Sequence, residues 1–287
     1  MSGRRAARIL GRALLHALLV VFAVLTAVPF LWMVASAFKT NADFFTCVFL
    51  PPGRGFLGVA WDRLTLENFS RLFRMIPMAR ALLNSMFLAS TCSVAATLFG
   101  AMGGYALARF EFRGRGLLTT LVLGTAILPL PLLLAPRFEL LFHLHLLDSY
   151  AGYLLPQLAP AFGVFLFRQA MLNSVPAELI ESARLDGCGE IRIFFSLVLP
   201  LVRPMAGAFI IITFLGVWND FIGPQIILQS TERIPLAVTL ASLRGLYLTD
   251  YGMLMAGTVV SVAPVILLFL LLQREFISVL TSGAVKD

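Results

Sequence analysis

The chain has 287 residues, of which 59% are hydrophobic and only 13% are charged, and its mean hydropathy is strongly positive. So much apolar surface cannot be buried in an ordinary soluble core, which excludes a soluble domain and indicates a polytopic membrane protein. The net charge of +7 does not indicate a nucleic-acid partner, because the Lys and Arg residues lie at the ends of apolar segments, where they act as topology signals.

The apolar segments predict an all-α fold in which six helices cross the membrane within a single domain, 1–287. The first segment, 13–38, reaches about 39 Å as a helix, enough to cross a bilayer with tilt. A signal peptide is the alternative, since Arg4, Arg5 and Arg8 precede the segment, but signal peptides have an apolar core of only about 7–15 residues. The other expected spans are 81–108, 116–136, 149–167, 204–223 and 251–273.

Small residues and prolines mark particular spans. In the second span, Gly100 and Gly104 form a small-residue stripe with Ala96 and Gly103, so another helix backbone is expected to approach it closely. Prolines kink a span and free backbone carbonyls, which is tolerated only where protein or a water-filled cavity satisfies those groups. The third span is therefore expected to face the bundle interior or a pathway. The kinking prolines are Pro129 and Pro131 in the third span and Pro156 and Pro160 in the fourth.

The distribution of positive charge predicts the orientation. Lys and Arg residues before the first span, in 109–115, in 168–203 and after 273 number thirteen, against nine in the longer loops of the opposite side. Short, positively charged loops face the cytoplasm, so both termini are expected to be cytoplasmic.

One charged segment, Glu178–Pro200, lies between the fourth and fifth spans and therefore at the cytoplasmic face. The stretch 174–176 is expected to start a helix by supplying a Ser cap and a Pro with a fixed φ. Gly187 is expected to end that helix, since glycine readily takes the left-handed conformation of a tight reversal. A second helix is expected at about 190–199, ended by Pro200. Composition alone also allows a solvated loop with local helix.

The spacing within this segment is more specific. Glu181-Ser182-Ala183, Gly187 and 197–200 match the EAA-x3-G-x9-I-x-L-P signature, with Ser182 for the usual Ala and Leu197 for Ile. The chain thus resembles the permease subunits of bacterial ABC importers, and looks closest to the smaller, maltose-type permease of the carbohydrate importers. The resemblance covers nearly the whole chain. Its supporting stretches are 67–69, 84–85, 106–115, 180–187, 218–221, 254–257 and 280–287.

The resemblance implies a cytoplasmic coupling loop, 171–200, whose helix docks on an ATPase. Glu181 is expected to contact the ATPase or to pair with Arg184 three residues on. The coupling residues it implies are Glu181, Ser182, Ala183, Leu185, Asp186, Gly187, Leu199 and Pro200.

The resemblance also implies partners: a homologous second permease, two ABC ATPase subunits and an extracytoplasmic solute-binding protein, assembled in a bacterial inner membrane with lipid around them. The chain has no G-x-x-x-x-G-K-[ST] stretch to hold ATP phosphates, so we expect ATP and Mg on the ATPase and neither catalysis nor a cofactor here. No metal site is expected, because His143 and His145 face different sides of a helix and Cys47, Cys92 and Cys188 lie far apart.

The end of the fifth span carries polar residues. Asp220 can lie at the interface with Trp218 as its aromatic anchor, or Asn219 and Asp220 can lie near an outer gate and meet a hydroxyl-rich solute. In the maltose-type family, the loop between the fifth and sixth spans reaches into the binding protein; here that loop is 225–250.

Three rival functions remain. A secondary transporter usually keeps ionisable residues in mid-span, and none is found there. A membrane enzyme needs a converging catalytic set, which His16, His143 and His145 do not supply. Within the recognised class, nothing in the sequence excludes import of a polyol phosphate instead of a sugar.

Overall fold

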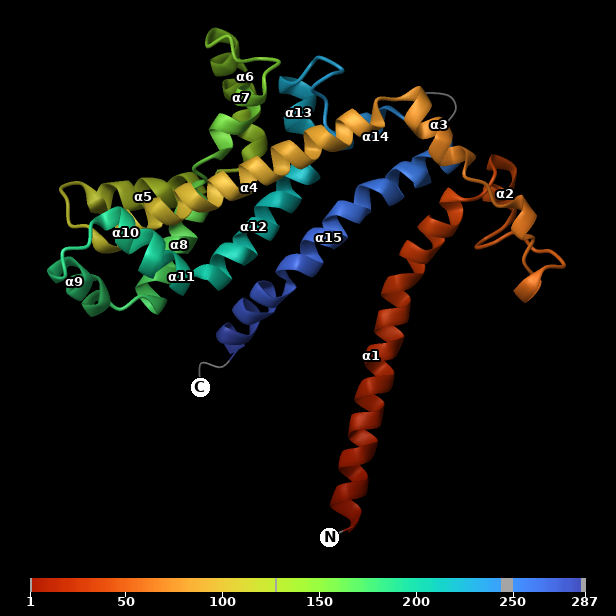
Figure 1. The fold of residues 1–287 in the computed structure, drawn as a ribbon, viewed down its shortest axis with the longest axis horizontal. Coiled ribbons are helices and arrows are strands. Elements are labelled where there is room, and N and C mark those ends of the chain that lie inside the picture. The colour runs from red at the N-terminus through yellow and green to blue at the C-terminus, as the bar shows by residue number, and fades with distance from the viewer. Residues whose placement is uncertain (1, 127, 244–249, 285–287) are drawn as a thin grey trace. The chain divides into compact units, whose positions relative to one another are not determined.

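A computed structural model of the chain describes residues 2–126, 128–243 and 250–284. Those residues form helices joined by turns, with one isolated backbone bridge, Pro52 to Val59, and no strand among them. The predicted all-α class is therefore confirmed. The chain divides into two compact units, one formed by Met1–Ile76 with Leu240–Val262 and the other by Pro77–Thr239 with Ala263–Asp287. Figure 1 shows their elements in chain order.

Several described helices are long and apolar enough to cross a membrane. Four qualify singly, and a fifth qualifies if Glu190–Leu201 and Arg203–Trp218 are taken together across their 81° bend. The predicted third span, 116–136, is not among them, because its helix stops at Ala126. A polytopic membrane fold is thus established, while the count of six spans stays a prediction. The four single helices are Ile9–Ala37, Met78–Arg109, Tyr150–Ser174 and Tyr251–Arg274.

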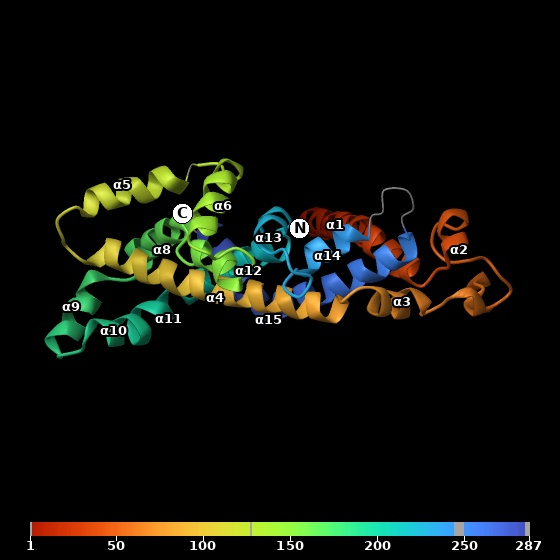
Figure 2. The same cartoon turned by 90° about the horizontal axis from the view of Figure 1, so that it is seen from above.

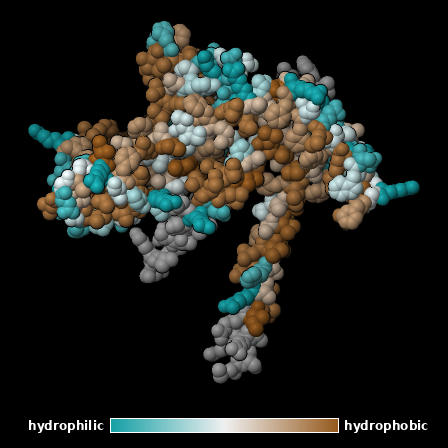
Figure 3. Space-filling view, viewed as in Figure 1, coloured by the Kyte–Doolittle hydropathy of each residue, from teal (hydrophilic) through white to brown (hydrophobic). Residues whose placement is uncertain are grey.

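The first unit begins with α1, whose stretch Ile9–Ala37 is strongly apolar. Leu14, Leu18 and Leu25 are each more than half exposed, as expected of a helix that contacts lipid or another chain. Figure 3 shows apolar side chains along this helix. The helices of this part of the chain are α1 (Ser2–Ala37), α2 (Asn41–Thr46), η1 (Phe56–Gly58), η2 (Trp61–Arg63) and α3 (Glu67–Met75).

Side-chain hydrogen bonds to backbone order the loop after α1. The amide of Asn68, which is buried, donates to the carbonyls of Ala37 and Lys39 at 2.9 and 2.7 Å. The buried Lys39 ammonium donates in turn to the carbonyls of Cys47 and Val48, both at 2.8 Å. Because these carbonyls would otherwise lack partners, the polar residues hold the loop in one conformation.

The second unit is built around α4 (Met78–Arg109), which packs on α8 (Ala161–Ser174) and α12 (Arg203–Trp218), as Figures 1 and 2 show. The glycine stripe accounts for the close approach. A Cβ on Gly104 would lie 2.7 Å from the backbone nitrogen of Arg168. A Cβ on Gly163, on the facing side of α8, would lie 2.7 Å from the ring of Phe209 in α12. The predicted close packing of the second span is confirmed.

Breaks occur at the prolines identified in the sequence. In the region of the third span, α5 stops at Ala126 and a 3-10 turn at Leu130–Leu133 contains Pro131. In the fourth span, Pro156 lies in the turn η4 and Pro160 immediately precedes α8. The elements here are α5 (Arg115–Ala126), η3 (Leu130–Leu133), α6 (Leu134–His143), α7 (Tyr150–Leu154) and η4 (Leu155–Gln157).

The remaining elements are short, except for the last helix, α15. The expected tail match, 280–287, and the expected binding-protein loop, 225–250, lie partly outside the described residues. The elements are α9 (Ala177–Leu185), α10 (Glu190–Ile193), the π-turn η5 (Phe194–Val198), α11 (Leu199–Leu201), α13 (Ile222–Ile227), α14 (Leu236–Ser242) and α15 (Tyr251–Ala284).

Candidate functional site

The charged segment between the fourth and fifth expected spans folds as a helix, a tight turn and a second helix. Its first helix, α9, has Pro176 at its N-cap, Glu178 in its first turn and Arg184 in its last turn, an order of charges that suits the helix dipole. The expected Ser cap is wrong, because Ser174 is the last residue of α8. Pro176 is the N-cap instead, and no side chain caps the helix.

The turn at Gly187 has the geometry of a Schellman motif. Gly187 has φ +77°, its N–H donates to the carbonyl of Arg184 at 3.0 Å, and the N–H of Cys188 donates to Ala183 at 3.0 Å. A Cβ on Gly187 would meet nothing within 4 Å. The requirement for glycine is therefore conformational and not steric, as the sequence predicts.

The second helix begins at Glu190 and runs through Pro200 to Leu201, so the expectation that Pro200 ends it is wrong by one residue. Pro200 is tolerated because the π-turn η5 precedes it and alters the local backbone pairing. After Val202 the chain turns by 81° into α12. The segment Glu190–Leu201 therefore projects away from the axis of α12.

The predicted coupling residues lie on both sides of this helix-turn-helix. Ala183 is buried with Ile180 in the core of the second unit, and so α9 is packed against that core. Leu185 is 89% exposed at the turn, which is unusual for a large apolar side chain. The others that are exposed are Glu181, Ser182, Asp186, Gly187 and Pro200, whereas Leu199 is partly buried.

Arg184 pairs with a residue beyond the turn. Its Nε lies 2.6 Å from Glu190 Oε1, so of the two alternatives for Glu181 the pairing with Arg184 is wrong. The Schellman turn brings the start of α10 back beside α9, which is why the partner is six residues away and not three. The hydrogen bond from Arg184 lowers the pKa of the Glu190 carboxyl. Glu181 makes no hydrogen bond or ion pair with the described part of the chain.

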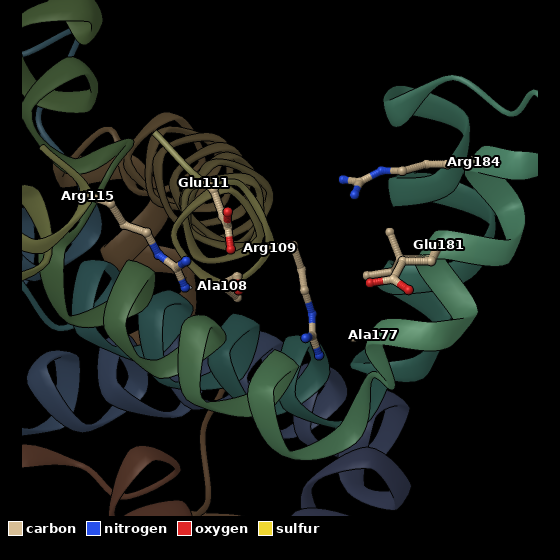
Figure 4. A pocket seen from close by; sticks show the side chains of 8 residues that line it. Ala108, Arg109, Glu111, Arg115, Ala177, Glu181 and Arg184 are labelled. Carbon is tan, nitrogen blue, oxygen red and sulfur yellow. Dashed lines mark hydrogen bonds between the residues drawn. The ribbon is translucent and has the colours of Figure 1, made fainter. Parts of the chain in front are cut away.

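A charged hollow of about 180 Å³ separates α9 from the end of α4. Figure 4 shows Glu181 and Arg184 reaching into it from α9, opposite Arg109, Glu111 and Arg115. The hollow is lined by Ala108, Arg109, Glu111, Arg115, Ala177, Ile180, Glu181 and Arg184.

Two arginines that line this hollow donate hydrogen bonds to backbone carbonyls at the ends of helices. Arg115 donates from Nε to the carbonyl of Leu107 at 2.9 Å, in the last turn of α4. Arg109 donates to the carbonyls of Met171 and Val175, at the end of α8. Carbonyls in the last turn of a helix lack a full set of partners within it, although that of Met171 also accepts the N–H of Val175 at 3.1 Å. Both arginines therefore fix helix termini next to α9.

The predicted gate residues are mostly engaged in packing. Trp218 is buried and its ring stacks on Phe214 at 5.4 Å, and only Asn219 is exposed. The Asp220 carboxylate accepts a hydrogen bond from the Tyr153 hydroxyl at 2.9 Å and one from the Gly223 N–H at 3.1 Å. Asp220 therefore joins α7 to the start of α13.

Sequence reasoning missed a second polar cluster, which holds the segment after α13. Asp148 has φ +52°, and its carboxylate accepts hydrogen bonds from the N–H of Gln229 at 3.0 Å and of Ser230 at 2.9 Å, and pairs with Arg233. The Asn84 amide donates to the carbonyl of Glu232 at 2.9 Å, in the same segment. The signal for Asp148 was present, since an aspartate in a loop favours such backbone contacts.

The described residues contain no group of three or more His, Cys, Asp or Glu side chains that could hold a metal ion. What they present is a helical membrane protein with a helix-turn-helix docked beside one end of its packed spans. That arrangement is the one expected from the sequence, a membrane protein with a charged helix-turn-helix between two spans.

The chain matches the family of binding-protein-dependent transport system inner membrane components over residues 1–277, and it belongs to that family. The resemblance to permease subunits of ABC importers is thereby confirmed. The protein is a multi-pass inner-membrane permease.

Two curated relatives and two solved structures are similar to it. The arabinooligosaccharides transport system permease protein AraQ of Bacillus subtilis is 43% identical over 203 residues, 71% of this chain and 72% of that protein. The sn-glycerol-3-phosphate transport system permease protein UgpE of Yersinia pestis is 34% identical over 206 residues, 70% of this chain and 72% of that protein.

The fold is shared with a bacterial ABC transporter involved in the import of the acidic polysaccharide alginate. Its chain has a TM-score of 0.79 and 23% identity, covering 95% of this chain and 98% of that one. A second structure of an alginate transporter, in complex with a periplasmic protein that carries alginate pentasaccharide, has a TM-score of 0.63 and 15% identity, with 93% and 95% covered.

Proposed function

We propose that this chain, together with a second permease, forms the translocation pathway of an ATP-driven importer for a sugar that a binding protein delivers. The observation that supports this most directly is the turn at Gly187, which joins α9 to α10 with the spacing of the importer signature. AraQ, whose name specifies arabinooligosaccharides, favours a sugar as the solute.

The ATPase contact in this proposal is the exposed side of the loop 171–200. Leu185 lies at the tip of the turn, next to the exposed Asp186, with Glu181 one helical turn before it. A large apolar side chain that is almost fully exposed on a short helix suits insertion into a cleft of a soluble partner. The buried Ala183 and Ile180 keep α9 attached to the spans while the other side is docked.

The orientation in this proposal rests on the charge distribution. Both termini and the loop 171–200 lie in the cytoplasm, where two ATPase subunits bind ATP and Mg, and no cofactor binds to this chain. Closing the ATPase pair moves α9 as a rigid body, and the attached spans rock so that the pathway opens to each side in turn.

The gate and the binding-protein contact lie at the opposite face. Among Trp218, Asn219 and Asp220, only Asn219 is exposed, and it is the residue that we propose meets a solute hydroxyl. The loop 225–250 contacts the binding protein, and Asp148 holds the start of that loop.

A polyol phosphate is the second candidate solute. It is favoured by the likeness to UgpE, whose name specifies sn-glycerol-3-phosphate. The six-span architecture and the coupling loop are the same in both versions, so only the solute distinguishes them.

Reconstitution tests both versions. The chain is assembled with its candidate partner permease, ATPase subunits and binding proteins, and ATP hydrolysis is measured with oligosaccharides and with glycerol phosphates. We expect a sugar-loaded binding protein to stimulate hydrolysis. Stimulation only by a glycerol phosphate selects the second candidate, and no stimulation by any loaded binding protein contradicts the importer function.

A further inference from the structure

The carboxylate of Glu190 joins α9 to α4, two helices that do not follow one another in the chain. Its Oε1 accepts a hydrogen bond from Arg184 Nε of α9 at 2.6 Å, and its Oε2 accepts one from the Tyr105 hydroxyl of α4 at 2.8 Å. Glu190 is the first residue of α10, immediately after the turn. One side chain therefore ties the helix before the turn and the helix after it to the end of the second span.

Tyr105, Glu190 and Arg184 form a bridge of hydrogen bonds that lies beside an aromatic cluster. The Tyr105 ring, which is 4% exposed, lies 5.3 Å from the ring of Phe110 and 5.8 Å from that of Phe194. The guanidinium of Arg184 lies over Phe110 at 5.9 Å. The Tyr105 hydroxyl is thus held in place by packing, so that the hydrogen bond to Glu190 has a fixed anchor on α4.

Tyr105 follows Gly104, the glycine of α4 that approaches a neighbouring helix most closely. Gly104 lies against the backbone of Arg168 in α8, so closely that even a methyl group would not fit. Since α4 packs on both α8 and α12, displacing the end of α4 displaces the packed group of three spans.

We infer that Glu190 is a positioning residue through which the coupling helix moves the second span directly. The chain alone connects α9 to α8 before it and, through α10, to α12 after it. The bridge of Tyr105, Glu190 and Arg184 adds a third connection, to α4, between spans that are far apart in the sequence. This inference rests on the proposed function, and it states which side chains carry the movement.

The bridge differs from an ordinary surface ion pair. Arg184 and Glu190 have side chains 38% and 41% exposed, so their pairing alone adds little stability. What distinguishes Glu190 is that its second carboxylate oxygen accepts a hydrogen bond from the buried Tyr105 of α4. Loss of this bond is therefore expected to affect the transmission of movement more than the folding of the chain.

The test uses the full assembly of this chain with the second permease, the ATPase subunits and the binding protein in proteoliposomes. The variants are Tyr105→Phe, which removes a single oxygen atom, Glu190→Gln, and the two combined. Glu139→Gln is the matched control, because Glu139 is exposed on α6 and has no hydrogen bond or ion pair with the described residues. Copurification of the ATPase, ATP hydrolysis and solute uptake are measured for each.

We expect each single variant to keep its ATPase and its hydrolysis but to lose about three- to tenfold in uptake per ATP, as for one partly exposed charge-assisted hydrogen bond. The double variant is expected to lose no more than Glu190→Gln alone, because the two residues act through the same bond. The control is expected to match the unchanged chain.

Wild-type uptake per ATP in both Tyr105→Phe and Glu190→Gln overturns the inference. So does a loss of ATPase copurification equal to the loss of uptake in Tyr105→Phe, since the bridge then serves only docking. Either result leaves the importer function intact if Gly187→Val still uncouples the assembly. An unchanged assembly that shows no ATP-driven uptake removes the proposed function and this inference together.

Discussion

Gly104 of α4 and Arg168 of α8 approach so closely that a Cβ on the glycine would lie 2.7 Å from the backbone nitrogen of the arginine. The same Cβ would lie 2.8 Å from Phe167 Cβ. Neither atom belongs to the flexible end of a side chain, so neither can move aside easily. This contact fixes the distance between the second and fourth expected spans. Because α9 follows α8 directly, it also helps to fix the position of α9.

Substituting Gly104 is therefore expected to destabilise the chain. Gly104→Val forces the two helices apart and is predicted to cost about 1–3 kcal/mol or more, as for overpacking in a dense core. Thermal unfolding of the purified chain in detergent measures the effect. Gly216→Val is the control, because a Cβ on Gly216 of α12 meets nothing within 4 Å. Equal melting temperatures for both variants contradict the close packing described.

Leu185 is predicted to contribute to ATPase binding. Its side chain is 89% exposed, and burying a leucine in a partner's cleft stabilises a complex by about 1.5–3 kcal/mol. Leu185→Ser is therefore expected to weaken the permease–ATPase complex about tenfold or more without changing the stability of the chain. Surface plasmon resonance with the purified ATPase measures the affinity. Leu57→Ser, at a leucine 79% exposed in the first loop, should bind as the unchanged chain does.

The Asp148 cluster predicts a pH dependence. The Ser230 hydroxyl, followed by the Ser230 and Gln229 N–H groups and Arg233, lowers the pKa of Asp148 below its usual 3.8. Because the folded-state pKa is the lower one, the stabilisation is complete above about pH 4 and is lost as the pH falls through the folded-state value.

A spin label at Thr231 is accordingly expected to be immobile at pH 7 and to become mobile only below about pH 4. Asp148→Asn, which keeps a residue tolerant of positive φ, should make the label mobile already at pH 7. An immobile label in Asp148→Asn at pH 7 is the result that contradicts this role of the carboxylate.

Tyr153 is predicted to support Asp220. The Tyr153 side chain is fully buried and its hydroxyl is the donor to the Asp220 carboxylate. Tyr153→Phe leaves that carboxylate without this donor, at a predicted cost of about 1.5–3 kcal/mol for a hydrogen bond to a charged group. Chemical unfolding detects the change. Tyr251→Phe serves for comparison, because Tyr251 stacks on Phe44 without a described side-chain hydrogen bond, and it should leave stability unchanged.

The features that the sequence predicted best are those that depend on local backbone chemistry. Gly187 needs only a positive φ after a helix, and Gly104 needs only a missing side chain in an apolar run. Both requirements act on one residue and its neighbours, so the residue type reveals them. The prolines at positions 131 and 160 likewise mark breaks where the structure has them.

The features that the sequence did not predict depend on the tertiary fold. Glu190 and Tyr105 are 85 residues apart, and the tyrosine is hidden within an apolar run. The pairing of Arg184 with Glu190 instead of Glu181 follows from the return of the chain at Gly187, which spacing along one helix cannot show. The third span was inferred from composition, and proline geometry divides that stretch.

Uptake of solute into proteoliposomes by the Gly187→Val variant tests the central claim most directly. Valine is strained at φ +77° by about 1–2 kcal/mol or more, although its side chain has room, so the turn is distorted and the chain still inserts. Gly187→Asn is the matched control, since asparagine tolerates that conformation.

We predict that Gly187→Val hydrolyses ATP but accumulates at least about tenfold less solute per ATP than Gly187→Asn, as expected if the turn transmits at least about 1.4 kcal/mol of coupling. Uptake by Gly187→Val equal to that of the unchanged assembly contradicts the claim that this turn couples the ATPase to the spans.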